Sequence, residues 1–189
     1  MGKFDTYKVD LKGMQQDQQV IEYLLDSNFF ANIGGEDVQN GKIKVQLTVN
    51  KVGGAYQMDF SLNGSIMIPC DRCLDDMDFP IETTSRLTVK FGKDYAEESD
   101  EIIVVPESEG VINLAWFLYE FVALAIPIKH VHAPGKCNKQ MAAKLRKHSA
   151  TVDGDDSDAF EPDYEEDIDI ADEEEDKTDP RWDALKSLK

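Results

Sequence analysis

Cysteine is scarce in this chain of 189 residues, which contains only three. An odd and small number argues against a secreted domain held by disulfides, so we expect reduced thiols in a cytoplasm. Long apolar runs are also missing, because Asn113 and Glu120 interrupt the stretch from Ile112 to Ile128, which is too short to span a membrane. The first residues lack the apolar run of a secretory signal. We therefore expect a cytoplasmic protein with no membrane partner.

Motifs of catalysis are missing as well. The sequence has no phosphate-binding loop, no His-Glu-x2-His motif and no nucleophile elbow. The glycine pairs Gly34-Gly35 and Gly53-Gly54 are typical of turns. The sequence therefore predicts a binding protein that is not an enzyme and has no small-molecule substrate.

Basic residues are few, with 20 Lys and Arg against 38 Asp and Glu, and the net charge is −18. Most of this charge comes from residues 152–180, which hold 16 acidic side chains and one basic residue, Lys177. Such a segment buries too little apolar surface to offset the entropy of ordering, so we expect a disordered acidic linker over residues 151–178. It is either a solubilising spacer or a mimic that competes with nucleic acid for a basic surface.

A basic segment precedes the acidic one. No acid lies between Lys129 and Ala150, and a short helix is predicted from Asn138 to Lys147. The candidate RNA- or partner-binding cations of this segment are Lys129, Lys136, Lys139, Lys144, Arg146 and Lys147. They could release counterions from a phosphate backbone or hold the acidic segment of the same chain. The alternative is a solvated helix face.

Alternating hydrophobicity predicts a sheet in the first two-thirds of the chain. Residues 42–51 alternate apolar and polar side chains, and Gly53-Gly54 predicts a hairpin to a second strand, in which we expect Gly64 to form a bulge. Residues 79–91 and 101–106 predict further strands. Helices are predicted over residues 15–26 and 113–126, the second one buried. We therefore expect an α+β domain over residues 1–150, with a mostly antiparallel, curled sheet and two main helices.

The cysteines suggest a metal site. Cys70 and Cys73 form a Cys-x2-Cys motif in a predicted turn, a spacing that lets two thiolates bind one tetrahedral zinc ion. Cys137 and His132 would complete a closed site for structural zinc, with His130 as the alternative imidazole. Redox chemistry would need a βαβ context that is missing here. Reduced cysteines packed as small hydrophobic side chains are the other alternative.

The last residues, 179–189, form a candidate docking peptide. Asp179 and Pro180 suit the start of a short amphipathic helix, in which Trp182 and Leu185 share one apolar stripe. Such a peptide can bind a groove of a partner, with Trp182 as the anchor, or it can fold back on its own domain.

Four blocks of the sequence together resemble the YceD family, the large ribosomal RNA subunit accumulation proteins of bacteria and plastids. The blocks are Cys70 to Cys73, Ile112 to His132, Cys137, and Asp179 to Lys189. By position, the family pattern falls on Cys70, Arg72, Cys73, Glu120, Leu124, Pro127, His132, Cys137, Pro180, Leu185 and Leu188. The chain departs from the family in its longer acidic spacer and in Asn113, where the family often carries Asp.

The resemblance implies a cytoplasmic, non-catalytic role in the accumulation or processing of large-subunit ribosomal RNA. Two hypotheses follow. In the first, the chain is a ribosome-biogenesis factor that binds precursor RNA or a large-subunit protein. In the second, it is an acidic adaptor or chaperone that holds a basic large-subunit ribosomal protein without contacting RNA.

Overall fold

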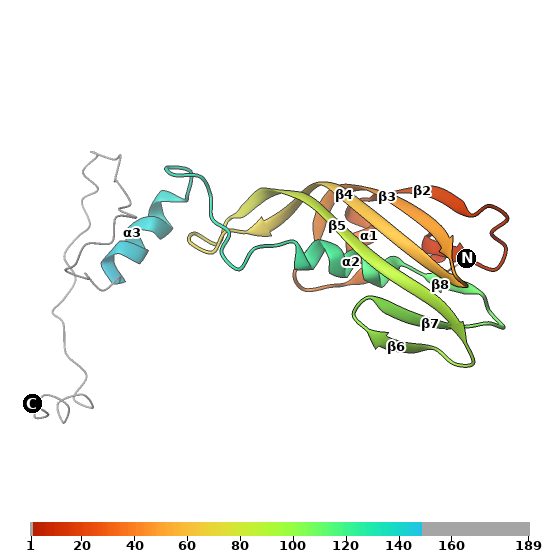
Figure 1. Ribbon diagram of the computed structural model, residues 1–189. Helices are drawn as coiled ribbons and strands as arrows, with labels where there is room; N and C mark the ends of the chain where they lie inside the picture. Colours follow the sequence, from red (N-terminus) through yellow and green to blue (C-terminus); the bar gives the residue numbers. More distant parts are fainter. Residues whose placement is uncertain (1, 149–189) are drawn as a thin grey trace, which may run out of the picture. The chain divides into compact units, whose positions relative to one another are not determined.

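A six-stranded sheet dominates the structure, a computed structural model that describes residues 2–148 (Figure 1). Listed in spatial order, its strands are β2 (Gln18–Leu25), β3 (Asn40–Val52), β4 (Ala55–Pro69), β5 (Asp76–Gly92), β7 (Ile102–Pro106) and β6 (Ala96–Ser99). All neighbours run antiparallel except β5 and β7, which are parallel. A separate two-stranded sheet pairs β1 (Lys8–Asp10) with β8 (Val111–Asn113). The predicted α+β class with a mostly antiparallel sheet is confirmed.

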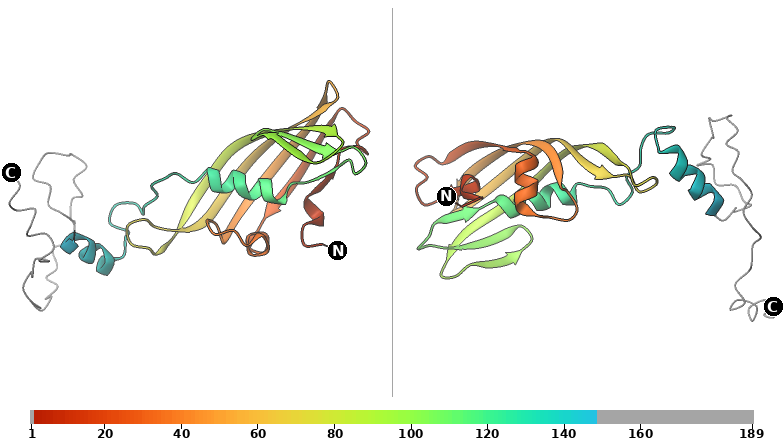
Figure 2. Two further views of the ribbon diagram at one scale, coloured as in Figure 1. Left: turned by 90° about the horizontal axis from the view of Figure 1, so that it is seen from below. Right: turned by 180° about the vertical axis from the view of Figure 1, so that it is seen from behind.

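One face of the large sheet holds the hydrophobic core. Successive side chains of a strand point to opposite faces, and β3 buries Ile43, Val45, Leu47 and Val49 while the residues between them are more exposed. The even-numbered apolar residues of β4 join the same core, together with buried residues of two helices. These helices are α1 (Ser27–Ile33) and α2 (Ala115–Leu124), and α2 crosses the sheet in Figure 2. The opposite face of β3 and β4 is mostly polar, although it also exposes Val52 and Met67.

The predicted hairpin between β3 and β4 is present, but the prediction of a bulge at Gly64 is wrong. Gly53 and Gly54 have φ angles of 58° and 85°, which a tight hairpin turn requires. Gly64 pairs without interruption with Ile43 on one side and Ile81 on the other. An ideal Cβ at Gly64 would lie 2.1 Å from the carbonyl oxygen of Lys42. Glycine therefore permits a close backbone approach at this position instead of an extra residue.

The helix predicted over residues 15–26 is also wrong, because residues 18–25 form β2. All eight residues of this strand pair with β3, and Ile21, Tyr23 and Leu25 face the core at a spacing of two. The helix in this region comes afterwards. Asp26 starts α1 by accepting a hydrogen bond from the backbone N–H of Phe29 at 3.0 Å.

The second predicted helix is present but is only half buried. Asn113 accepts a hydrogen bond from the backbone N–H of Ala115, and α2 then runs to Leu124, three residues before Pro127. Leu118 and Val122 are buried, whereas Trp116 and Leu124 are exposed. A third helix, α3 (Lys139–His148), matches the one expected from Asn138 to Lys147. No helix within residues 2–148 is long and apolar enough to cross a membrane.

The acidic linker and the docking peptide fall beyond residue 148. The predictions of a disordered tail and of an amphipathic helix carrying Trp182 and Leu185 thus lie outside the described residues.

Candidate metal centre

The Cys-x2-Cys motif occupies the tight connection between β4 and β5. The backbone N–H of Cys70 donates to the carbonyl of Asp75 at 2.9 Å, and that of Leu74 donates to the carbonyl of Cys70 at 2.8 Å. Leu74 is the one non-glycine residue with positive φ, at 63°, among the residues that the structure describes. These two bonds close the connection between β4 and β5, in which Cys70 and Cys73 are buried.

A second segment, between α2 and α3, lies against this connection. Asp71 forms a reciprocal contact with it, because its N–H donates to the carbonyl of His130 at 3.0 Å and its carboxylate accepts from the N–H of His130 at 2.7 Å. Asn138 donates from its side-chain amide to the Asp75 carboxylate at 3.1 Å. Because these bonds join residues about 60 positions apart, they fix the register of the two segments.

Four ligand atoms converge between these segments. One atom each from Cys70, Cys73, His132 and Cys137 lies within 4.8 Å of all the others. The Sγ atoms of Cys70 and Cys137 are 4.0 Å apart, and Cys73 Sγ is 3.4 Å from His132 Nδ1. Zinc with Zn–S bonds of about 2.3 Å would hold its sulfur ligands about 3.8 Å apart, so the spacing suits a tetrahedral ion. All three cysteines are free.

Hydrogen bonds favour the thiolate form of Cys70. Burial raises the pKa of this thiol, but hydrogen bonds from the backbone N–H groups of Cys73, His132 and Arg72 outweigh it and lower the pKa from 9.0 to about 6. One of these, from the N–H of His132, measures 3.4 Å. Backbone donors therefore stabilise negative charge on one sulfur before any cation is considered.

Cys137 differs from Cys70, because its surroundings favour the protonated thiol. Burial, followed by hydrogen bonding to Cys70 and Cys73 and by their charges, raises the pKa of Cys137 to about 11. Several thiolates packed this closely repel one another. A divalent cation at their centre would offset this repulsion, because it would stabilise every thiolate at once. Three thiolates and one imidazole are the donors that zinc prefers, so the chemistry of the set fits this ion.

The structure selects between the two candidate histidines. His132 joins the cysteines, whereas the His130 ring lies 3.1 Å from the carbonyl of Pro127 and 3.4 Å from an Asp71 carboxylate oxygen. The four predicted ligand residues are thus brought together, with His132 as the imidazole. The sequence did not point to Asp71, Asp75 or Asn138, which join the two segments.

The predicted basic segment continues directly from these ligands. Asn138, two residues before Gln140, accepts hydrogen bonds from the N–H groups of Gln140 and Met141 and so starts α3. Five of the six predicted cations have exposed side chains, namely Lys129, Lys136, Lys139, Lys144 and Lys147. For the sixth, Arg146, only the backbone is described. Trp182 and Leu185, the predicted anchors of the docking peptide, lie outside the described residues.

The fold is an α+β domain that carries a Cys3His group, and such a group could fill all four positions of a tetrahedral ion with side chains. Comparison with protein families identifies the group. A model described as the large ribosomal RNA subunit accumulation protein YceD matches residues 58–189, and the chain belongs to this family. The match begins within β4 and includes all four candidate ligand residues. No curated protein and no solved structure gives a significant match.

Proposed function

We propose that this chain is a non-catalytic ribosome-biogenesis factor that supports the accumulation or processing of large-subunit ribosomal RNA by binding precursor RNA. The family description supports the general role. The observation that carries the finer proposal is the continuity between the ligand group and the basic segment. His132 and Cys137 stand in the same stretch as the five exposed lysines, so whatever fixes these ligands also fixes the start of the cationic surface.

Zinc held by Cys70, Cys73, His132 and Cys137 is the structural part of this proposal. Bound zinc would add four bonds to a junction that otherwise depends on a few hydrogen bonds near Asp71 and Asn138. Its role would be to position the basic segment. A closed ligand set leaves no position for a substrate.

The proposed organisation has three parts. Residues 1–150 form the RNA-binding domain, residues 151–178 an acidic linker, and residues 179–189 a docking peptide anchored by Trp182 and Leu185. The acidic linker competes with RNA for the cations, since like-charged phosphate and carboxylate groups seek the same surface. We propose a cytoplasmic location for the protein.

RNA binding is tested with the full chain and with a variant lacking residues 152–180. The expected result is salt-dependent binding to large-subunit RNA that strengthens on deletion, because 16 competing acidic side chains are removed. If all six cations contact phosphate, the slope of log K against log salt approaches about −4 to −5. If the deletion variant still binds RNA unmeasurably weakly at low salt, direct RNA binding is wrong.

Charge-reversal variants distinguish RNA binding by the basic segment from nonspecific electrostatic attraction. Lys139→Glu with Lys144→Glu should weaken RNA binding and make the salt slope shallower by about two. The matched control reverses Lys42 and Lys44, which are exposed on β3. An equal loss of RNA affinity in the two double variants would contradict a specific role for the basic segment.

The second candidate function is an acidic adaptor for a basic large-subunit ribosomal protein. The net charge of −18 favours it, since it opposes contact with bulk RNA. A pull-down enriched in one basic ribosomal protein, unchanged by nuclease and lost when residues 152–180 are deleted, would favour the adaptor over the RNA-binding factor.

A further inference from the structure

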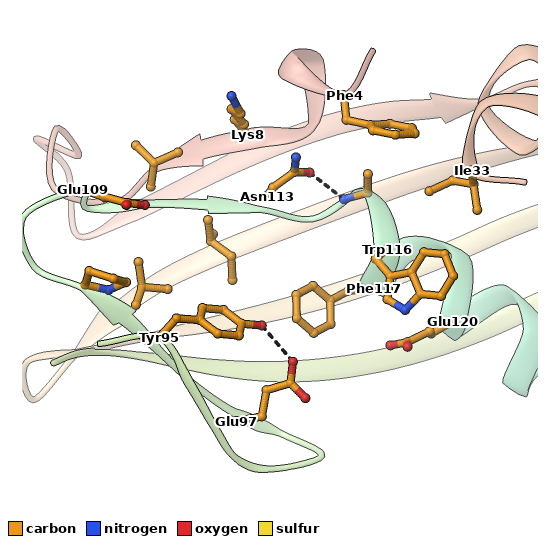
Figure 3. A pocket seen from close by; sticks show the side chains of 15 residues that line it. Phe4, Lys8, Ile33, Tyr95, Glu97, Glu109, Asn113, Trp116, Phe117 and Glu120 are labelled. Atoms are coloured by element: carbon orange, nitrogen blue, oxygen red, sulfur yellow. Dashed lines mark hydrogen bonds between the residues drawn. The ribbon is translucent and has the colours of Figure 1, made fainter. Parts of the chain in front are cut away.

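A groove of about 940 Å³ lies between α2 and the strand pair β6–β7, and none of the four candidate metal ligands lines it (Figure 3). Its floor is apolar and includes Ile33, Val105 and Phe117. Trp116 comes from the first turn of α2, and Tyr95 comes from the residue before β6. Their side chains are 52% and 53% exposed. Two large aromatic side chains thus remain half open to solvent beside apolar surface.

The rim of this groove is acidic. Glu97, Glu109 and Glu120 line it, and in Figure 3 Glu97 and Glu120 extend from opposite sides. Lys8, the one basic side chain among the described lining residues, forms an ion pair with Asp5 at 2.7 Å. The electrostatic balance of the groove is therefore negative.

Carboxylates from both sides of the groove affect the pKa of the Tyr95 hydroxyl. Tyr95 donates a hydrogen bond from its hydroxyl to Glu97 at 2.9 Å. Burial, then this hydrogen bond and the charges of Glu97 and Glu120, raise the pKa of Tyr95 to about 12. Glu120 belongs to α2 and Glu97 to β6, so carboxylates from both sides line the groove.

We propose that this groove binds a basic polypeptide segment that carries a bulky apolar side chain. The apolar side chain packs against the groove lined by Tyr95, Phe117 and Trp116, and flanking Lys or Arg side chains pair with Glu97 and Glu120. Aromatic anchors surrounded by complementary charge are the usual centre of a peptide-binding surface. A phosphate backbone would meet three carboxylates here, so charge complementarity selects a cationic polypeptide over RNA. This site goes beyond the proposed function and is independent of the metal ligands.

The test uses the fluorescence of Trp116 in the full chain, with Trp182→Phe removing the second of two tryptophans. The probe is the synthetic peptide Lys-Arg-Leu-Phe-Lys-Arg. One matched control peptide replaces each basic residue with Glu, and another replaces Leu-Phe with Ser-Ser. The expected result is a saturable change in Trp116 emission with the first peptide and at least about ten-fold weaker binding of both controls.

Variants of the protein locate the binding surface. Tyr95→Ala should weaken the basic peptide by about ten-fold or more, and Glu97→Lys or Glu120→Lys by roughly three- to ten-fold. The matched control is Glu98→Lys, since Glu98 pairs with Lys90 at 3.4 Å and does not line the groove. Circular dichroism verifies that each variant is folded.

Three results would overturn the proposal. They are the absence of any emission change at about 1 mM peptide, equal binding of the acidic peptide, or equal loss of affinity in the Glu98→Lys control. None of these outcomes bears on RNA binding by the basic segment, so the two proposals fail separately.

Discussion

Replacing Asp71 with alanine should weaken zinc binding without removing any ligand. The Asp71 carboxylate accepts the N–H of His130 at 2.7 Å and lies 3.4 Å from the ring Nε2 of the same residue. His132 follows two residues later, so this carboxylate holds the backbone that presents the imidazole ligand. Asp71 is therefore a positioning residue for the candidate imidazole ligand.

The expected magnitude follows from this indirect role. Loss of a partner that orients a metal ligand typically costs 10- to 100-fold in affinity, equivalent to about 1.4–2.8 kcal/mol. The Asp71 side chain is 41% exposed, so its contact with the His130 ring adds little to global stability. The free energy of unfolding of the metal-free protein should change much less than the zinc affinity.

Competition with a chromophoric zinc chelator measures the affinity of each variant. Asp71→Asn keeps an oxygen acceptor for the His130 N–H and should fall between wild type and Asp71→Ala. Asp78→Ala, an exposed acid on β5 of the same hairpin, is the matched control. A zinc affinity of Asp71→Ala within about two-fold of wild type would refute the positioning role, since loss of a residue that orients a metal ligand typically costs about ten-fold or more.

Three further predictions concern the fold and the groove. Gly64→Ala should destabilise the protein by about 2 kcal/mol or more in urea unfolding, because the new Cβ would lie 2.1 Å from the Lys42 carbonyl oxygen; unchanged stability would contradict the close approach. Tyr119→Phe should lower the free energy of unfolding by about 1–3 kcal/mol, because the Tyr119 hydroxyl accepts hydrogen bonds from the N–H groups of Asp37 and of buried Val38, the latter at 3.3 Å. A cost near zero would show that water replaces the hydroxyl. The pKa of Tyr95 is raised from 10.0 to about 12, so its stabilising contribution is complete below pH 10 and is lost as pH rises toward 12; Tyr95→Phe should lose less stability over this range, and an identical loss would contradict the shift.

Alternation of apolar and polar residues predicted the strands that have one solvent-exposed face. In β3, Ile43, Val45, Leu47 and Val49 alternate with polar residues, and the buried face follows directly from this spacing. The same reasoning failed for β2, where Val20, Ile21, Leu24 and Leu25 also fit a helical stripe. Pairing of the entire segment with β3 decides its conformation, and a single sequence does not contain that long-range partner.

The group of candidate metal ligands was predictable because metal chemistry restricts ligands to few residue types. Three cysteines and two nearby histidines left a small set to choose from, and only the choice between His130 and His132 required the structure. Asp71 was not predictable, because its partner is a backbone N–H distant in sequence. The groove at Trp116 and Tyr95 was missed for the same reason, since packing between distant segments creates it.

The most direct test of the central claim is metal content with coordination, measured on full chain purified without chelator. The account predicts one zinc per chain, with X-ray absorption showing three sulfur ligands near 2.3 Å and one nitrogen near 2.0 Å, and loss of the metal in Cys137→Ser. Substoichiometric zinc, together with unchanged thermal stability when Cys70, Cys73 and Cys137 all become serine, would contradict it.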